Sequence, residues 1–305
     1  MSSGNLGSSM TIHSLVKAHG QEVHDPEEES FLLFSQAIPS QNLGFVDSKA
    51  ARLELTIADR DLSIVQSPTI LSSNRGGGTT GAVVWKITPL FASWVTSPSN
   101  VFFKHDVLDS DSTVLELGCG ISGIIALSLA PRIRSYILTD QDYVMKLLHE
   151  NLRENQRVVS SNRGRKSNTK LKRGSAAASA LMQDPNILTQ TLDWETDEVA
   201  SSLTRSESCP SFDAVIACDC IYNDALIEPL VQACVDACKL RSANSADNQK
   251  PTVCIVAQQL RSAEVFESWL KVFGRPFHVW RVPDEELINE LKSGSGFVVH
   301  IGILK

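Results

Sequence analysis

The residues best suited to chemistry lie in a glycine-rich stretch near the middle of the chain. Residues 114–123 read Val-Leu-Glu-Leu-Gly-Cys-Gly-Ile-Ser-Gly and contain G-x-G-x-x-G directly after an apolar run. Glycines are needed at such a turn because the chain bends sharply and the backbone must approach a ligand closely. Asp140 follows 20 positions after Gly120 and could accept hydrogen bonds from ribose hydroxyls. The pattern therefore predicts a site for a nucleotide-like cofactor.

Glu116 indicates the charge of that cofactor. It stands two residues before the first glycine, where a carboxylate would repel the pyrophosphate of NAD. S-adenosyl-L-methionine carries an ammonium and a sulfonium at its methionine end, so an acid there suits it better. Glu116 could instead cap a neighbouring backbone group at the end of a strand. Because the glycine loop, the acid and Asp140 occur in register, we expect S-adenosyl-L-methionine as the cofactor and disfavour an NAD oxidoreductase.

The elements that must position these residues alternate along the chain. Apolar runs predict strands at 113–117, 136–139, 187–192, 212–218 and 252–257, followed near the end of the chain by 277–282 and 297–303. Helical spacing between them predicts helices at 122–130, 143–155, 226–239, 263–273 and 284–291. We therefore expect an α/β fold whose mostly parallel sheet has helices on both faces. Ahead of it, alternation predicts a β-hairpin at 53–64, and helical spacing predicts a helix at 82–95 that Pro89 should bend or shorten.

Three polar stretches and the N-terminus interrupt this pattern. Residues 1–50 are expected to form a largely disordered or irregular extension, because Ser, Gly and acidic residues dominate residues 1–30. Residues 156–183 form a low-complexity insertion with seven basic residues and no acid, and residues 195–211 and 241–250 are Ser-rich. Removing the seven positive charges from the net −7 leaves −14 on the rest of the chain. The insertion is therefore either a solvated loop or a contact for rRNA or an acidic surface.

Composition narrows the function further. A net charge of −7 argues against wholesale nucleic-acid binding. The N-terminus lacks the pattern of a signal peptide, and no segment is apolar for long enough to span a bilayer. Seven cysteines, mostly inside apolar runs, are typical of a reduced cytoplasmic protein or of a nuclear one. A zinc site at Cys218-x-Cys220 and Cys234-x3-Cys238 would have no histidine nearby, so we expect no metal and no membrane contact.

Three further motifs carry a family resemblance. They are Thr80-Gly81-Ala82-Val83-Val84-Trp85, Leu192-Asp193-Trp194 and Asp219-Cys220-Ile221-Tyr222. With the glycine loop they resemble the seven-β-strand (class I) protein lysine methyltransferase family, which has a T-G-x-x-x-W entry and a D-x-x-Y motif after the fourth strand. Within it, the likeness is greatest to the fungal ribosomal lysine N-methyltransferases, which modify a large-subunit protein. The resemblance runs from about residue 53 to the end and implies a Rossmann-like, seven-stranded methyltransferase domain over 51–305.

The resemblance implies roles for ten residues. Trp85 would close over the methionine end of the cofactor, Asp140 would hold the ribose, and Trp194 would lie against the adenine. The full set of implied cofactor contacts is Trp85, Glu116, Gly118, Cys119, Gly120, Asp140, Trp194 and Cys218. Asp219 and Tyr222 are the implied catalytic pair, bordering the opening through which the target lysine enters.

A catalytic role for Asp219 and Tyr222 follows from the chemistry of lysine. An amine with a pKa near 10.4 must lose its proton before it attacks a methyl group. Asp219 or Tyr222 could orient the amine or pass its proton to water, and the Tyr222 ring could contact the ammonium in a cation–π interaction. We expect both side chains to turn out of the core. The structural alternatives are a helix cap for Asp219 and a core aromatic for Tyr222.

Two other functions stay open at this point. One is a methyltransferase of the same fold that acts on RNA or on a small molecule. Such amine-methylating nucleic-acid enzymes are expected to carry Asn/Asp-Pro-Pro-aromatic where this chain has Asp219-Cys220-Ile221-Tyr222. The other is a catalytically inactive S-adenosylmethionine-binding module, although every cofactor position holds a competent residue. The favoured partner is a protein carrying the target lysine, such as a 60S ribosomal protein.

Overall fold

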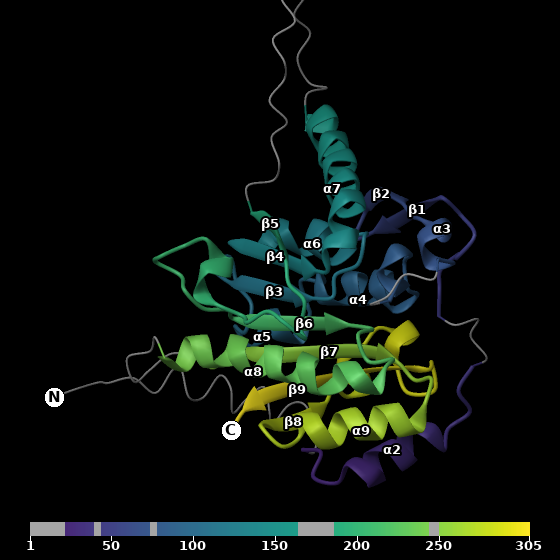
Figure 1. Cartoon of the computed structure of the whole chain (residues 1–305), viewed down its shortest axis with the longest axis vertical. Coiled ribbons are helices and arrows are strands. Elements are labelled where there is room, and N and C mark those ends of the chain that lie inside the picture. Colours follow the sequence, from purple (N-terminus) through teal and green to yellow (C-terminus); the bar gives the residue numbers. More distant parts are fainter. Residues whose placement is uncertain (1–21, 40–43, 74–77, 164–185, 244–249) are drawn as a thin grey trace, which may run out of the picture.

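A seven-stranded sheet forms the centre of the computed structural model, which describes residues 22–39, 44–73, 78–163, 186–243 and 250–305 (Figure 1). The strand order is β5-β4-β3-β6-β7-β9-β8, and β9 runs in the opposite direction to the other six strands. The predicted mostly parallel sheet is therefore confirmed. The strands are β3 (Thr113–Leu117), β4 (Ser135–Asp140), β5 (Ile187–Thr191), β6 (Ala214–Cys218), β7 (Val253–Gln259), β8 (Phe277–Arg281) and β9 (Phe297–Leu304).

The order of the strands fixes where a ligand can bind. The chain winds outward from β3 to β4 and β5, and then returns to place β6 on the other side of β3. Neighbouring crossovers leave the sheet in opposite directions at this point, so a crevice opens beyond the carboxyl ends of β3 and β6. The glycine loop follows β3 directly, and Asp219 follows β6. The fold therefore brings the two motifs to one edge of the sheet.

Helices cover both faces of the sheet (Figure 1). Leu115 and Leu117 of β3 pack in the core that includes α8 and α9, whereas Val114 packs in the core that includes α4 and α6. Glu116 alternates with the leucines, so its side chain points to the face of Val114. The covering helices are α4 (Ile87–Val95), α6 (Ile124–Leu129) and α7 (Asp142–Arg163) on one face, and α8 (Ile227–Ala243) and α9 (Ala263–Phe273) on the other.

The predicted hairpin is present as β1 (Arg52–Ile57) and β2 (Arg60–Val65). It is fastened to α7 by two asparagine side chains. Asn151 bonds the backbone N–H and carbonyl of Val65 at 2.8 and 2.9 Å, and Asn155 bonds those of Ser63 at the same distances. Three short elements lie between the hairpin and the first strand of the sheet: α3 (Pro68–Leu71), η1 (Thr80–Ala82) and α5 (Val101–Lys104). A further short turn, η2 (Ala130–Arg132), lies between α6 and β4.

The helix predicted at 82–95 is shorter than expected, because it begins at Ile87. Val83 is extended, and Val84 to Lys86 pair with an N-terminal segment. The N–H of Val46 donates to the carbonyl of Val84 at 3.0 Å, and the N–H of Lys86 donates to the carbonyl of Gly44 at 2.6 Å. These pairings, which come from residues far away in the sequence, outweigh the helical spacing of the apolar side chains.

The N-terminal extension is more regular than predicted. Helix α2 (Pro26–Phe34) begins at Asp25, whose carboxylate accepts from the N–H groups of Glu27 and Glu28. It packs against α9 (Figure 1), and its buried Glu29 accepts from the Nε2 of His300 at 3.0 Å. The expectation of an irregular segment is therefore wrong for residues 26–34, while residues 1–21 lie outside the described part of the chain.

Two other expectations need correction. Helix α7 continues to Arg163, so residues 156–163 of the predicted insertion are helical, and residues 164–183 lie outside the described residues. The helix predicted at 284–291 is two separate 3-10 turns, η5 (Asp284–Glu286) and η6 (Asn289–Leu291). The remaining 3-10 turns are η3 (Ser201–Thr204) and η4 (Asp224–Leu226). No helix in the described residues is long and apolar enough to cross a membrane.

Candidate active site

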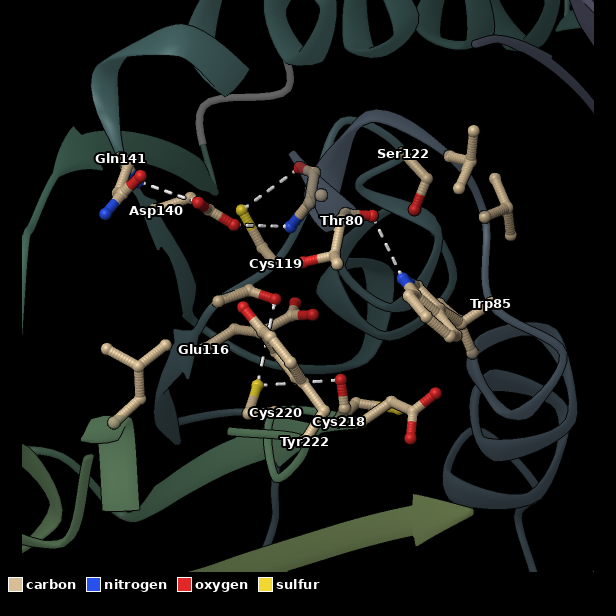
Figure 2. A pocket seen from close by; sticks show the side chains of 18 of the residues that line it. Thr80, Trp85, Glu116, Cys119, Ser122, Asp140, Gln141, Cys218, Cys220 and Tyr222 are labelled. Carbon is tan, nitrogen blue, oxygen red and sulfur yellow. Dashed lines mark hydrogen bonds between the residues drawn. The ribbon is translucent and has the colours of Figure 1, made fainter. Parts of the chain in front are cut away.

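A cavity opens at the carboxyl ends of β3, β4 and β6 (Figure 2). All the residues predicted for the site line it: Trp85, Glu116, Gly118, Cys119, Gly120, Asp140, Trp194, Cys218, Asp219 and Tyr222. Figure 2 shows Asp140 on one side of the cavity, Trp85 on the other, and Glu116 and Tyr222 between them. The fold therefore brings together side chains that lie up to 137 positions apart in the sequence.

The glycine loop brings the backbone up to the cavity, and Gly118 has no room for a side chain. Its φ is +68°, and a Cβ there would lie 2.8 Å from the Sγ of Cys220 and 3.0 Å from the ring of Trp194. Any larger residue would both strain the backbone and displace the Trp194 ring. Glycine at 118 is therefore required by the packing of the loop against Trp194.

Asp140 fastens the loop to the end of β4. Its Oδ2 accepts from the N–H of Gly120 at 2.8 Å, and its Oδ1 accepts from the N–H of Gln141 at 2.7 Å. Burial raises the pKa of Asp140 to about 6, while the two backbone donors act in the opposite direction. Each carboxylate oxygen has a second lone pair. Asp140 can therefore hold the loop and also accept hydroxyl donors from a ligand in the cavity.

Glu116 is a buried acid in the cavity wall, with 2% of its surface exposed. Burial raises its pKa to about 8; the hydrogen bond from the Tyr136 hydroxyl opposes this shift, and the nearby Asp140 adds to it. The described residues that line the cavity include no lysine or arginine. A cationic ligand would supply the counter-charge that Glu116 lacks, which fits the ammonium end of S-adenosyl-L-methionine.

Aromatic residues form another part of the cavity wall. The indole Nε1–H of Trp85 donates to the carbonyl of Thr80 at 3.1 Å, and its ring lies 4.4 Å from that of Phe45, centroid to centroid. Tyr222 also lines the cavity, and it is 39% exposed. Tyr222 is therefore not a core aromatic. Its burial on the cavity side raises the pKa of its hydroxyl.

Asp219 lines the cavity but is not free within it. Its φ is +61°, and Arg261 bonds both carboxylate oxygens, Nη1 to Oδ1 at 2.8 Å and Nη2 to Oδ2 at 2.5 Å. The side chain is buried instead of turning outward as expected. The alternative of a helix cap is also wrong, since the cap of the next turn is Asn223.

Sequence reasoning missed several residues of the cavity. Thr80 stood within a recognised motif, but nothing in the sequence showed that its carbonyl bonds Trp85. Arg261 does not line the cavity but bonds Asp219, which does; it had no signal in the sequence, because Asp219 is 42 positions away and meets it through the pairing of β6 with β7. The other lining residues not predicted are Gly81, Val83, Val84, Thr88, Ser122, Gln141, Tyr143, Leu192, Asp193, Cys220 and Leu226. No group of three or more potential metal ligands occurs among the described residues.

Comparison with known proteins agrees with this geometry. A family model described as lysine methyltransferase matches residues 65–166, the stretch that holds Trp85, the glycine loop and Asp140. The ribosomal lysine N-methyltransferase 5 of Kluyveromyces lactis is 30% identical over 293 residues, which cover 81% of this chain and 87% of the relative. The chain belongs to the lysine methyltransferase family.

Two other similarities are more limited. A Schizosaccharomyces pombe protein named diaminohydroxyphosphoribosylamino-pyrimidine deaminase is 27% identical over 87% of this chain, but the chain spans only 55% of its length. This sequence lacks H-x-E followed by P-C-x-x-C, the zinc signature of nucleobase deaminases. A crystal structure of a Bradyrhizobium japonicum N-methyltransferase with S-adenosyl-L-homocysteine is 11% identical, with a TM-score of 0.35, and the match covers 63% of this chain and 78% of that one.

Proposed function

We propose that this enzyme methylates a lysine side chain of a large-subunit ribosomal protein in the cytoplasm. The observation that carries the choice of substrate is the similarity to the Kluyveromyces lactis ribosomal lysine N-methyltransferase 5, which extends over 87% of that relative. The cavity supports the chemistry, because a buried acid and aromatic rings both line it. Both features suit cationic groups, one on the cofactor and one on the lysine.

The cofactor would lie along the glycine loop. Glu116 would meet the ammonium of its methionine end, Asp140 would accept from the ribose hydroxyls, and Trp194 would pack against the adenine. When bound, S-adenosyl-L-methionine supplies a methyl group that already carries its leaving group. The chain's own task is therefore to hold the donor and the amine in line and to exclude water.

The lysine would enter past Tyr222, the most exposed large aromatic residue of the cavity. Desolvation there favours the neutral amine over the ammonium. The Tyr222 ring can contact the incoming ammonium, a cation–π interaction of about 0.5–2 kcal/mol. The proton then leaves to water at the opening. Asp219 is already bonded to Arg261, so an indirect role suits it better than proton transfer.

The proposal is tested by methyl transfer from labelled S-adenosyl-L-methionine to ribosomal subunits from cells that lack the protein. We expect label on a lysine of one large-subunit protein, identified by mass spectrometry, and none on the small subunit. Ribosomes from cells that contain the protein are the control, since their lysine is already methylated. Label in rRNA or in a small molecule would contradict the proposal, and so would label confined to non-ribosomal proteins.

A further inference from the structure

Asp219 and Arg261 form a two-pronged ion pair on the acceptor side of the cavity. The Asp219 side chain is 1% exposed, and its carboxylate accepts two hydrogen bonds from the guanidinium. Its Oδ1 also accepts from the backbone N–H of Gln259 at 3.2 Å. Three donors thus meet this carboxylate, and a lysine amine would have to displace Arg261 to use it as a base.

Arg261 contacts the aromatic wall as well as Asp219. Its guanidinium carbon lies 4.6 Å from the ring centroid of Trp85, a distance at which a cation is attracted to the face of an indole. The guanidinium is planar and fixed by Asp219, so it presents a rigid surface to the ring. The position of the Trp85 ring therefore depends on the ion pair between β6 and β7.

Trp85 is connected in turn to Thr80, which lines the same cavity as Tyr222. The Trp85 indole donates to the backbone carbonyl of Thr80 at 3.1 Å, as Figure 2 shows. Thr80 also influences Tyr222: burial raises the pKa of the Tyr222 hydroxyl, and the Thr80 side chain acts in the opposite direction. A shift of the Trp85 ring would therefore move Thr80 and alter the surroundings of Tyr222.

We infer that Arg261 is a positioning residue for the acceptor lysine: held by Asp219, it sets Trp85, and through Thr80 it sets the opening at Tyr222. The contacts described above support the effect of Arg261 on Trp85, and the identity of the acceptor as lysine rests on the proposed function. On this view Asp219 acts through Arg261 and does not touch the amine. Lysine at position 261 would keep the positive charge but lose both the paired hydrogen bonds and the flat surface.

The first test reads the position of Trp85 directly and needs no substrate. The chain has five tryptophans, whose indole N–H signals can be separated by NMR of the ¹⁵N-labelled protein. The signal that is missing in a Trp85→Phe variant belongs to Trp85. We expect Arg261→Lys and Asp219→Asn each to shift the Trp85 signal and to leave those of Trp94 and Trp269 in place. Arg275→Lys is the matched control, because Arg275 pairs with Glu228 on the exposed surface.

The second test measures methyl transfer by the same variants. Arg261→Lys should raise the KM for the protein acceptor about tenfold or more, while the KM for S-adenosyl-L-methionine changes less than about twofold. The Asp219→Asn/Arg261→Lys double variant should be no worse than the more impaired single variant, because both changes break one connection. The melting temperature of each variant is recorded, so that a folding defect is recognised. If Arg261→Lys folds poorly, the two KM values of Asp219→Asn are compared with those of the unmodified protein instead.

The outcomes separate this inference from the proposed function. An unmoved Trp85 signal in folded Arg261→Lys protein would overturn the positioning role, whichever molecule accepts the methyl group. Effects of Asp219→Asn and Arg261→Lys that multiply in the double variant would also overturn it, because they would give Asp219 a separate action on the amine. A shifted Trp85 signal together with methyl transfer to RNA would instead leave the geometry intact and refute the lysine substrate.

Discussion

The hydroxyl of Tyr136 donates a 2.7 Å hydrogen bond to the carboxylate of Glu116, and both side chains are buried between β3, β4 and the helices of one face. This bond holds the Glu116 carboxylate in its place in the cavity wall. Burial nevertheless raises the pKa of Glu116 to about 8, so without a ligand the acid holds its proton at neutral pH. A cation arriving beside it favours the ionised form. Binding of the cofactor should therefore remove the proton.

The first prediction is that binding of S-adenosyl-L-methionine releases a proton below pH 8. Free Glu116 is mostly protonated there, whereas the bound form should be ionised, so affinity rises with pH by up to about tenfold per unit and levels off above pH 8. Calorimetry at pH 7 in two buffers of different ionisation enthalpy measures the release. Glu116→Gln provides the control, since it has no proton to lose. Equal release by the Gln variant would assign the proton to another group.

The second prediction concerns stability without the cofactor. The folded pKa of Glu116, about 8, lies above the ordinary value of 4.5, so its contribution to stability is fully present below pH 4.5 and is lost as the pH rises towards 8. At higher pH, ionisation of the buried acid costs free energy of folding, and Glu116→Gln removes this cost. It should add up to about 3 kcal/mol to the free energy of unfolding at pH 7 and almost nothing at pH 4. Urea unfolding at both pH values measures the difference, and an equal effect at both would show that ionisation is not its cause.

Much of the fold was predictable because its signals are local. The apolar runs, with helical spacing between them, predicted all seven strands to within a few residues. The site residues were predictable for a related reason: the glycine loop, Asp140, Trp194 and Asp219 each follow a strand, and parallel strands end at one edge of a sheet.

What could not be predicted depends on contacts between distant residues. Val84 and Trp85 have helical spacing but are extended, because the backbone of residues 44–46 pairs with them. Asp219 resembled a free acid, because nothing near it in the sequence announces Arg261. Residues 1–50 were expected to lie apart from the catalytic domain, but the ring of Phe45 contacts Trp85 in the cavity wall.

The third prediction tests the role of Asp140. Asp140→Ala should weaken binding of S-adenosyl-L-methionine about tenfold or more, because it removes both the proposed acceptor for the ribose hydroxyls and the hydrogen bond that holds Gly120. Isothermal calorimetry measures the affinity, and the melting temperature should fall by only a few degrees. Asp142→Ala is the matched control, since Asp142 is an exposed acid two residues later. Unchanged affinity in Asp140→Ala would remove Asp140 from the cofactor site.

The fourth prediction tests whether the N-terminal segment at residues 44–46 is part of the catalytic unit. Gly44 has a φ of +78°, and a Cβ there would lie 2.0 Å from the Oε1 of Gln259 and 2.7 Å from the Nη2 of Arg261. Gly78 has a similar φ of +90° with nothing within 4 Å of such a Cβ. Alanine at either position therefore brings the same backbone strain, but only at position 44 does it also collide with packed side chains.

The comparison of these two glycines isolates the packing. Gly78→Ala should lower the free energy of unfolding by about 1 kcal/mol, the cost of a left-handed conformation. Gly44→Ala should cost at least about 1–2 kcal/mol more, because Gln259 and Arg261 must move. It should also raise the KM for the protein acceptor, since Arg261 holds Trp85, while Gly78→Ala leaves that KM unchanged. Urea unfolding and initial rates measure both effects. Equal destabilisation by the two variants would show that the packing of residues 44–46 does not contribute to stability. These residues would then belong to the irregular extension, as expected from the sequence.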